Sequence, residues 1–137
     1  MVQAPAPANH ILVVGNGGNV MGLDPMTGNT RWEVNPKGAG SVELAIEGSV
    51  VIAANDVNVA FIDYSTGHVH AIVPLTGDKM GRPTMVVAGG HLFIGRPGEV
   101  RCLTLRGQPV WTKELLGRGQ RSLSLGFPGN IRQADDR

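Results

Sequence analysis

The sequence predicts an all-β fold built from repeated four-stranded antiparallel units. Twenty glycines and nine prolines in 137 residues divide the chain into short segments. Several segments alternate apolar and polar residues, as at Val42, Leu44 and Ile46, which is the period-2 pattern of a half-buried strand. The chain also repeats itself about every 40 residues.

The repeat appears when the stretch 11–34 is shifted by 39 residues. ILVVGNGGNVMGLDPMTGNTRWEV then falls on VVIAANDVNVAFIDYSTGHVHAIV, residues 50–73, and Asp24 falls on Asp63. A third copy, LFIGRPGEVRCLTLRGQPVWTKEL, covers residues 92–115 and is one residue shorter in its last turn. These copies account for three strands of each unit.

A further strand precedes the second copy at 41–46 and the third copy at 83–88. A tight turn, Glu47-Gly48 or Gly89-Gly90, joins it to the next strand. Each unit is therefore four short strands in about 40 residues, which is the size and content of a β-propeller blade.

The segment Gly15-Asn16-Gly17-Gly18 follows an apolar strand and could be read as a phosphate-binding loop. That fingerprint requires a third glycine, where this chain has Val20, and a helix after the loop. Asp24-Pro25 and Thr27-Gly28 interrupt the residues that follow, so no helix is expected there. The repeat places Ala54–Val57 and Gly95–Gly98 at the same point, and we interpret all three segments as hairpin turns.

The last turn of each unit carries a recognisable motif. Residues 22–32 read GLDPMTGNTRW, which resembles the A-x-D-x-x-T-G-x-x-x-W blade repeat of the PQQ-like, quinoprotein-type β-propellers. The second copy keeps Asp63 and Thr66-Gly67 but has Ala71 in place of the tryptophan. The third keeps Gly107 and Trp111 but has lost the Asp and the Thr.

The resemblance covers roughly residues 10–131 and implies the propeller fold rather than one activity, because the family includes dehydrogenases, assembly scaffolds and sensors. We interpret the motif residues as structural: the Asp accepts hydrogen bonds within its turn, and the Trp packs between blades. These residues are Asp24, Asp63, Trp32 and Trp111.

The tail resembles the start of a further blade. Residues 121–131, RSLSLGFPGNI, fall on residues 40–50 when shifted by 81, so we expect a first strand there. The chain itself begins with a second strand, and the three four-stranded antiparallel blades are permuted by one strand. Propellers carry about four to eight blades, so we expect half of a six-bladed ring, although a module of a longer propeller is the alternative.

We therefore expect a head-to-tail homodimer, in which the closing strand of each chain completes the first blade of its partner. The self-association residues would be Ser122, Leu123, Leu125, Phe127 and Ile131. The expected organisation is an irregular lead-in at 1–9, a propeller module at 10–131 and a polar tail at 132–137, with blade cores at 10–34, 41–73 and 83–115 and a closing strand at 121–131.

One propeller face is predicted to be basic. The turns between second and third strands share a face with the loops between blades, and the sequence places an excess of Lys and Arg there. The binding residues expected on this basic loop face are Lys37, Lys79, Arg82, Arg96, Arg118 and Arg121. An acidic protein surface or a polyanion would be the complementary partner.

No catalytic constellation is recognisable. Cys102 is the only cysteine, which excludes an intrachain disulfide. His68 and His70 could share a strand face, but no carboxylate or thiol stands at ligand spacing, so no metal site is predicted. The quinone and calcium of quinoprotein dehydrogenases are not carried over, because their stacking and ligand residues have no identifiable counterpart. We expect a protein without a cofactor and not an enzyme.

The predicted function is a non-catalytic scaffold and protein-interaction module that closes by self-association and presents loop faces to a partner. A structural component of a virion or tail is one alternative. A lectin-like propeller is another, although the few aromatics do not recur at one repeat position. With a net charge of +1, no signal peptide and no apolar run long enough to span a membrane, we expect a cytoplasmic or virion location.

Overall fold

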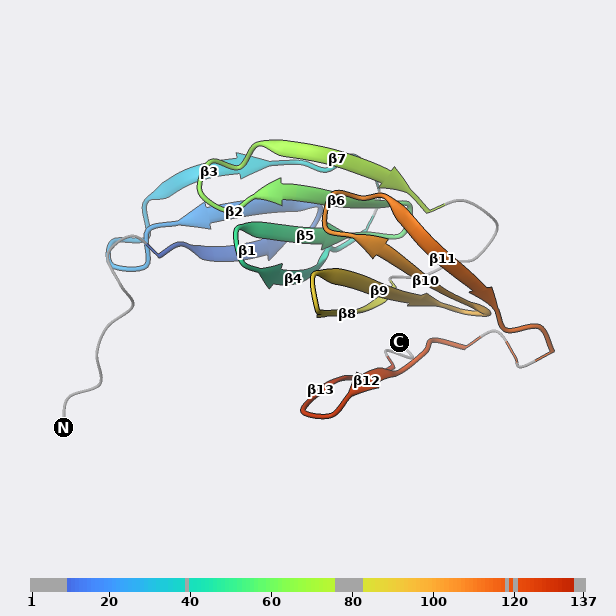
Figure 1. Ribbon diagram of the computed structural model, residues 1–137. Helices are drawn as coiled ribbons and strands as arrows, with labels where there is room; N and C mark the ends of the chain where they lie inside the picture. Colours follow the sequence, from blue (N-terminus) through green and yellow to red (C-terminus); the bar gives the residue numbers. More distant parts are fainter. Residues whose placement is uncertain (1–9, 39, 76–82, 118, 120, 135–137) are drawn as a thin grey trace.

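The computed structural model describes residues 10–38, 40–75, 83–117, 119 and 121–134, and these residues form an all-β fold without a helix (Figure 1). Every strand pairing is antiparallel. Within the described residues, the strands form one three-stranded, two four-stranded and one two-stranded sheet, in chain order along the molecule. The expected lead-in at 1–9 lies outside the described residues, as does the end of the expected tail.

Three blades follow one another. Blade one consists of β1 (Leu12–Asn16), β2 (Asn19–Leu23) and β3 (Thr30–Val34). Blade two consists of β4 (Glu43–Glu47), β5 (Val50–Ala54), β6 (Asn58–Asp63) and β7 (Val69–Pro74). Blade three consists of β8 (Thr84–Ala88), β9 (His91–Arg96), β10 (Glu99–Thr104) and β11 (Pro109–Glu114).

The repeat seen in the sequence recurs in the backbone. Each blade has a register shift between its last two strands, at Gly22/Leu23, Phe61/Ile62 and Cys102/Leu103. These bulges fall at one repeat position, directly before the turn of the motif. The segment Gly15–Gly18 is a hairpin turn between β1 and β2, with Gly17 at a φ of 60°, so the interpretation as a turn is confirmed.

The core lies between blades. One cluster joins blades one and two around Trp32, Val51 and Ile62. The other joins blades two and three around Phe61, Leu92 and Leu103. Because each blade uses both faces in this way, a blade at either end of the chain has one face without a full neighbouring sheet.

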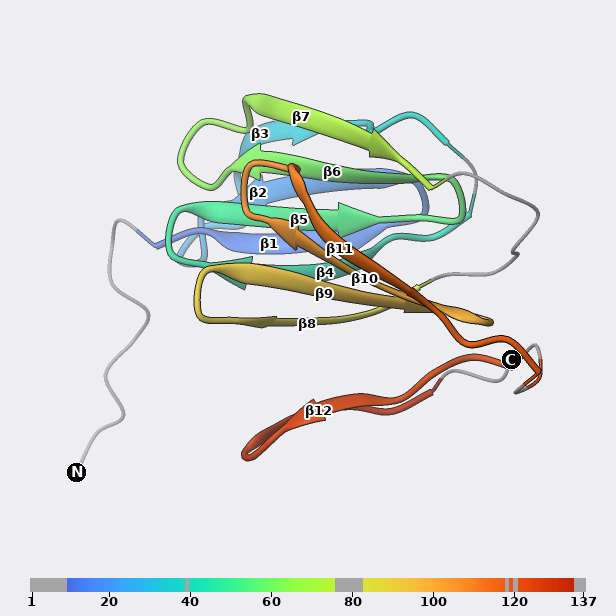
Figure 2. The same ribbon diagram turned by 45° about the vertical axis from the view of Figure 1, so that its right-hand side comes forward.

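The predicted closing strand at 121–131 differs from the structure. That segment holds two short paired strands, β12 (Leu125–Phe127) and β13 (Asn130–Arg132), joined by a turn at Pro128-Gly129. Gly129 has a φ of 74°, which permits the tight reversal. The tail is therefore the first hairpin of a further blade, and Figures 1 and 2 show it beside β8.

Candidate interaction surfaces

The motif turns of blades one and two are held by their aspartates. Asp24 Oδ1 accepts a hydrogen bond from the Met26 amide at 2.8 Å. Asp63 Oδ1 accepts bonds from the Ser65 and Thr66 amides, both at 2.9 Å. The pKa of each carboxyl lies below its ordinary value of 3.8. The main cause is a hydrogen bond from a backbone amide, that of Met26 for Asp24 and that of Thr66 for Asp63. These contacts confirm the structural interpretation of both aspartates.

Blade three builds the same turn with a hydroxyl. Thr104 Oγ1 accepts hydrogen bonds from the amides of Arg106 and Gln108, at 3.2 and 3.1 Å. The Gly107 amide donates to the Thr104 carbonyl at 3.0 Å, as Gly67 does to Asp63 at 2.9 Å. The lost Asp of the third copy is thus replaced by Thr104 in the same role.

Trp32 joins blade one to blade two. Its side chain is 7% exposed, and its indole Nε1 donates to the Tyr64 carbonyl at 3.0 Å. A Cβ placed on Gly67 would lie 2.7 Å from the indole, and one placed on Gly22 would lie 2.4 Å from it. The ring therefore fills the space left by one glycine beneath it and one in the next blade's turn, as the interblade interpretation predicts.

Blade two supplies its aromatic ring from a neighbouring strand. Ala71 stands at the tryptophan position and pairs with Phe61, whereas Trp32 pairs with Gly22. Phe61 is fully buried, and a Cβ on Gly107 of blade three would lie 3.2 Å from its ring. The large and the small residue of the pair have thus exchanged strands: blade one has Gly22 opposite Trp32, and blade two has Phe61 opposite Ala71. A comparison of single positions does not reveal this compensation.

The outer face of blade three carries an aromatic cluster. Phe93 contacts Trp111 with ring centroids 6.1 Å apart and Phe127 with centroids 5.2 Å apart. Trp111 is 44% exposed. The three residues occupy three different repeat positions, and Phe127 reaches Phe93 only through packing of the tail. A search for aromatics at one repeat position therefore does not find the cluster.

The tail hairpin places most of the predicted self-association residues against blade three. Thr84 Oγ1 donates to the Leu123 carbonyl at 2.6 Å, and Asn130 Nδ2 donates to the Val87 carbonyl at 2.9 Å. A Cβ on Gly95 would lie 3.1 Å from Leu123. Ser122 and Leu125 are partly buried, and Phe127 and Ile131 are exposed.

The loop that carries Lys37, on the face predicted to be basic, is held by the side chain of Asn55. Asn55 is buried, and its Nδ2 donates to the carbonyls of Pro36 and Lys37 at 3.1 and 3.3 Å. Its Oδ1 accepts from the amides of Val57 and Asn58 at 2.9 and 2.8 Å. This one side chain ties the loop between blades to the turn of blade two, and it leaves the Lys37 side chain exposed.

Arg96 does not belong to that exposed face. Its side chain is 2% exposed, because it occupies the inward-pointing repeat position that Asn55 holds in blade two. Burial is the main cause that lowers the pKa of its guanidinium, while Glu99 and Asp56 raise it. Arg121 is exposed as predicted; Lys79, Arg82 and Arg118 lie outside the described residues.

The histidine pair is exposed on blade two, and the lone cysteine is buried in blade three. The rings of His68 and His70 are 5.3 Å apart, and His70 Nε2 lies 3.9 Å from Asp63 Oδ2. Within the described ranges, no three His, Cys, Asp or Glu side chains are grouped to hold a metal ion. Cys102 is buried opposite Trp111, and burial raises the pKa of its thiol.

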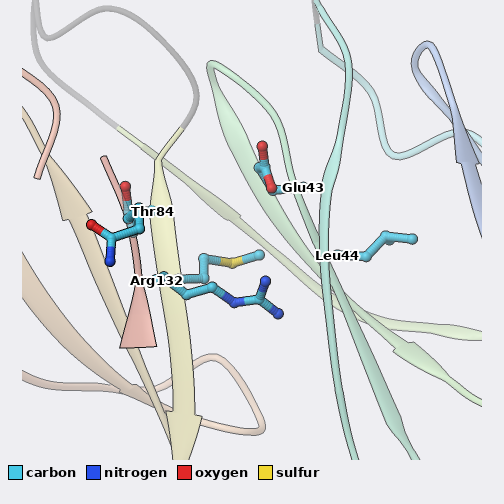
Figure 3. Close-up of a pocket in the computed structure, with 6 residues that line it drawn as sticks. Glu43, Leu44, Thr84 and Arg132 are labelled. Atoms are coloured by element: carbon cyan, nitrogen blue, oxygen red, sulfur yellow. The ribbon is translucent and has the colours of Figure 1, made fainter. Parts of the chain in front are cut away.

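Two hollows lie between blades two and three. Figure 3 shows the smaller, of about 160 Å³, with Glu43 of β4 and Arg132 of β13 pointing into the space beside β8. The larger, of about 540 Å³, lies by the motif turn of blade two. It is lined by Ser49, Val50, Asp63, His70, Leu105 and Arg106.

No helix in the described part of the chain could cross a membrane.

Repeated blades, bulges at one position and a motif turn that packs on the preceding blade define a PQQ-like β-propeller, and this prediction from the sequence is confirmed. A family described as outer membrane protein assembly factor BamB matches residues 1–77, more than half of the chain. The chain belongs to this family.

Solved structures support the fold. BamB from Moraxella catarrhalis is 25% identical with a TM-score of 0.60, over 86% of this chain and 36% of its own. A europium-containing methanol dehydrogenase is 16% identical with a TM-score of 0.61, over 80% and 24% of the two chains. The quinohemoprotein alcohol dehydrogenase of Comamonas testosteroni is 20% identical with a TM-score of 0.62, over 80% and 20%.

The two dehydrogenases share the fold with this chain at an identity that carries no information on activity. The chain spans about a third of the length of the BamB structure and less of the dehydrogenases. No curated protein matches the chain.

Proposed function

We propose that the chain is a non-catalytic β-propeller scaffold that binds protein partners through its loop faces and completes its ring by head-to-tail self-association. The observation that carries the proposal is the family match over residues 1–77, since the family is described as an assembly factor for outer membrane proteins. A partner of the same kind, a protein in the course of assembly, is the class that we infer.

The construction of the blades supports a scaffold. The motif residues Asp24, Trp32 and Asp63 are used in turns and packing. Such contacts make a rigid frame on which loops hold fixed positions. Lys37 is presented in this way by Asn55, and Arg121 stands on the corresponding loop after blade three. The proposed surface for a partner is the loop face that carries Lys37 and Arg121, and Asn55 holds its Lys37 loop in place from beneath.

Self-association is inferred from the sheet edges. In blade two, the innermost strand β4 pairs with β5, and β1 is the repeat equivalent of β5. Strand β12 is the equivalent of β4 and already lies beside blade three, but it pairs with β13 over only three residue pairs. We propose that β1 of a second copy takes the place of β13, which would complete blade one of that copy.

The partner-binding part can be tested by site-specific photocrosslinking. Crosslinkers replace Lys37 and Arg121 on the loop face, and matched controls replace Thr66 and Arg106 in exposed motif turns on the opposite face. We expect one defined protein product from the loop face, lost at high salt. The product from a crosslinker at position 37 should also be lost when Arg121→Glu is added, and the product from position 121 when Lys37→Glu is added. Equal products from both faces, or a product indifferent to charge reversal, would contradict the proposal.

The non-catalytic part has its own test. Thermal unfolding is measured with and without pyrroloquinoline quinone and calcium, because ligands that bind the folded state raise the melting temperature. We expect no shift in the melting temperature, and a rise of several degrees would show a cofactor site that the proposal lacks.

The cytoplasmic or virion location expected from the sequence stays a prediction, and cell fractionation would test it.

A further inference from the structure

The two ends of the blade array carry complementary halves of one interface. Between blades one and two, the Trp32 ring lies against Gly67 and donates to the Tyr64 carbonyl. The repeat equivalents of these three residues are Trp111 at one end of the array and Gly28 with Pro25 at the other. In this chain the two sets belong to opposite ends and do not meet.

Both sets lie open to solvent. Trp111 is 44% exposed, against 7% for Trp32. A Cβ on Gly28 would have no atom within 4 Å, whereas one on Gly67 or Gly107 would lie within 3 Å of the preceding blade. The motif turn of blade one is thus the only one of the three turns without a blade in front of it in the described structure.

The surrounding surface of blade one matches the one that receives Trp32. Blade two buries Val51 and Ile62 in the contact with blade one. Their repeat equivalents are Leu12 and Leu23, which are apolar as well, and Leu12 is 54% exposed. A hollow of about 150 Å³ lies next to this surface, lined by His10, Ile11, Leu12 and Pro25.

The face of blade three matches the opposite half. Val13, Val20 and Trp32 of blade one pack toward blade two, and their equivalents are Phe93, Val100 and Trp111. The two faces differ at the rim, where blade three has Lys113 at the repeat position of Val34. A charged residue at a rim position keeps its charge in water while its stem covers apolar surface.

We propose that the face of blade three that carries Trp111 binds the face of blade one that carries Gly28 in a second copy. We call this contact the seam. Trp111 packs on the Gly28 turn and its Nε1 donates to the Pro25 carbonyl, as Trp32 does within the chain with Gly67 and Tyr64. The seam rests on the self-association in the proposed function and names the surface that forms it. A proline supplies the required carbonyl, since only its amide hydrogen is missing.

The test compares dissociation constants from sedimentation equilibrium of the full chain and four variants. Trp111→Ala removes the anchor, and its control Val110→Ala removes an exposed side chain from the opposite face of β11. Gly28→Ala adds a methyl group at a residue with a φ of 79°, and within one chain no atom lies within 4 Å of that group. Its control, Gly48→Ala, adds a methyl group with equally free surroundings at a residue with a φ of 59°. Circular dichroism confirms that each variant is folded.

We expect Trp111→Ala to weaken self-association by about thirtyfold or more, as for a buried interface anchor. Gly28→Ala should weaken it by about tenfold or more, while both controls stay within about threefold of the wild type. A chain that associates equally in all five forms overturns the seam and leaves self-association standing. A folded chain that remains one copy at every concentration overturns both.

Discussion

Trp32 and Trp111 occupy the same position of the repeat and differ in what covers them. The following blade's turn lies over Trp32 and accepts its indole hydrogen bond. No following blade covers Trp111 in the described structure, and its ring contacts Phe93 of its own blade instead. A blade is therefore not a self-sufficient unit, because half of each tryptophan site is built by the next blade along.

The largest expected effect separates the two tryptophans. Trp32→Ala removes a buried ring and should lower the free energy of unfolding by about 3–5 kcal/mol. Trp111→Ala, measured at a dilution where the chain is a single copy, should cost less than about 1 kcal/mol because the ring is already half exposed. Urea unfolding followed by circular dichroism gives both values. Equal losses would show that Trp111 is covered in the single chain.

The next effect tests the exchange of large and small residues. Phe61→Gly should cost about 3–5 kcal/mol through the cavity it opens. Ala71→Trp alone should cost about 1–3 kcal/mol through overpacking against Phe61. The double variant recreates the Gly22–Trp32 pairing of blade one, so it should lose less than the sum of the singles by about 2 kcal/mol or more. Additive losses would contradict compensation.

A smaller effect compares two motif glycines. Gly67 and Gly28 have nearly equal φ values of 78° and 79°, so alanine meets the same backbone strain at both, of about 1 kcal/mol. At Gly67 the methyl group would also collide with Trp32, which should raise the cost to about 2–3 kcal/mol. Thermal unfolding at low protein concentration measures the difference. A larger loss at Gly28 than at Gly67 would contradict this packing.

The smallest effect concerns pH. The pKa of Asp63 is lowered in the folded chain, so its carboxylate contributes stability above about pH 4, and this is lost as pH falls through the folded pKa. Asp63→Ala should lower the melting temperature by about 2–5 °C at pH 7, with the gap closing toward pH 3. Thr104→Ala is the control, because its hydroxyl holds the same turn without a charge. A pH-independent gap for Asp63 would contradict the account.

The sequence predicted those parts of the fold that repeat. Strand order, the Gly15–Gly18 turn and the roles of Asp63 and Trp32 follow from residue types that recur at a fixed spacing. The exchange of Phe61 and Ala71 was not predicted, because it depends on which strands pair. The hairpin in the tail was missed because Pro128-Gly129 was aligned with a tight turn but not interpreted as one.

The candidate surfaces were predicted less well, for a physical reason. Charge was assigned to a face from loop position alone; Lys37 and Arg121 are exposed, whereas Arg96 is buried. The burial of Arg96 follows from its alignment with Asn55, because Asn55 points inward to bond a neighbouring loop and Arg96 occupies the same repeat position. The cluster at Trp111 required the packing of the tail on Phe93, which no local pattern contains.

The accessibility of Trp111 in solution shows whether blade one of a second copy covers blade three. Acrylamide quenching of tryptophan fluorescence is measured on the full chain across a wide range of protein concentration. The account predicts that one of the two tryptophans is quenched at high dilution and becomes protected as concentration rises, while Trp32 stays protected throughout. A Trp111 that remains accessible at the highest concentration, in a folded chain, would contradict it.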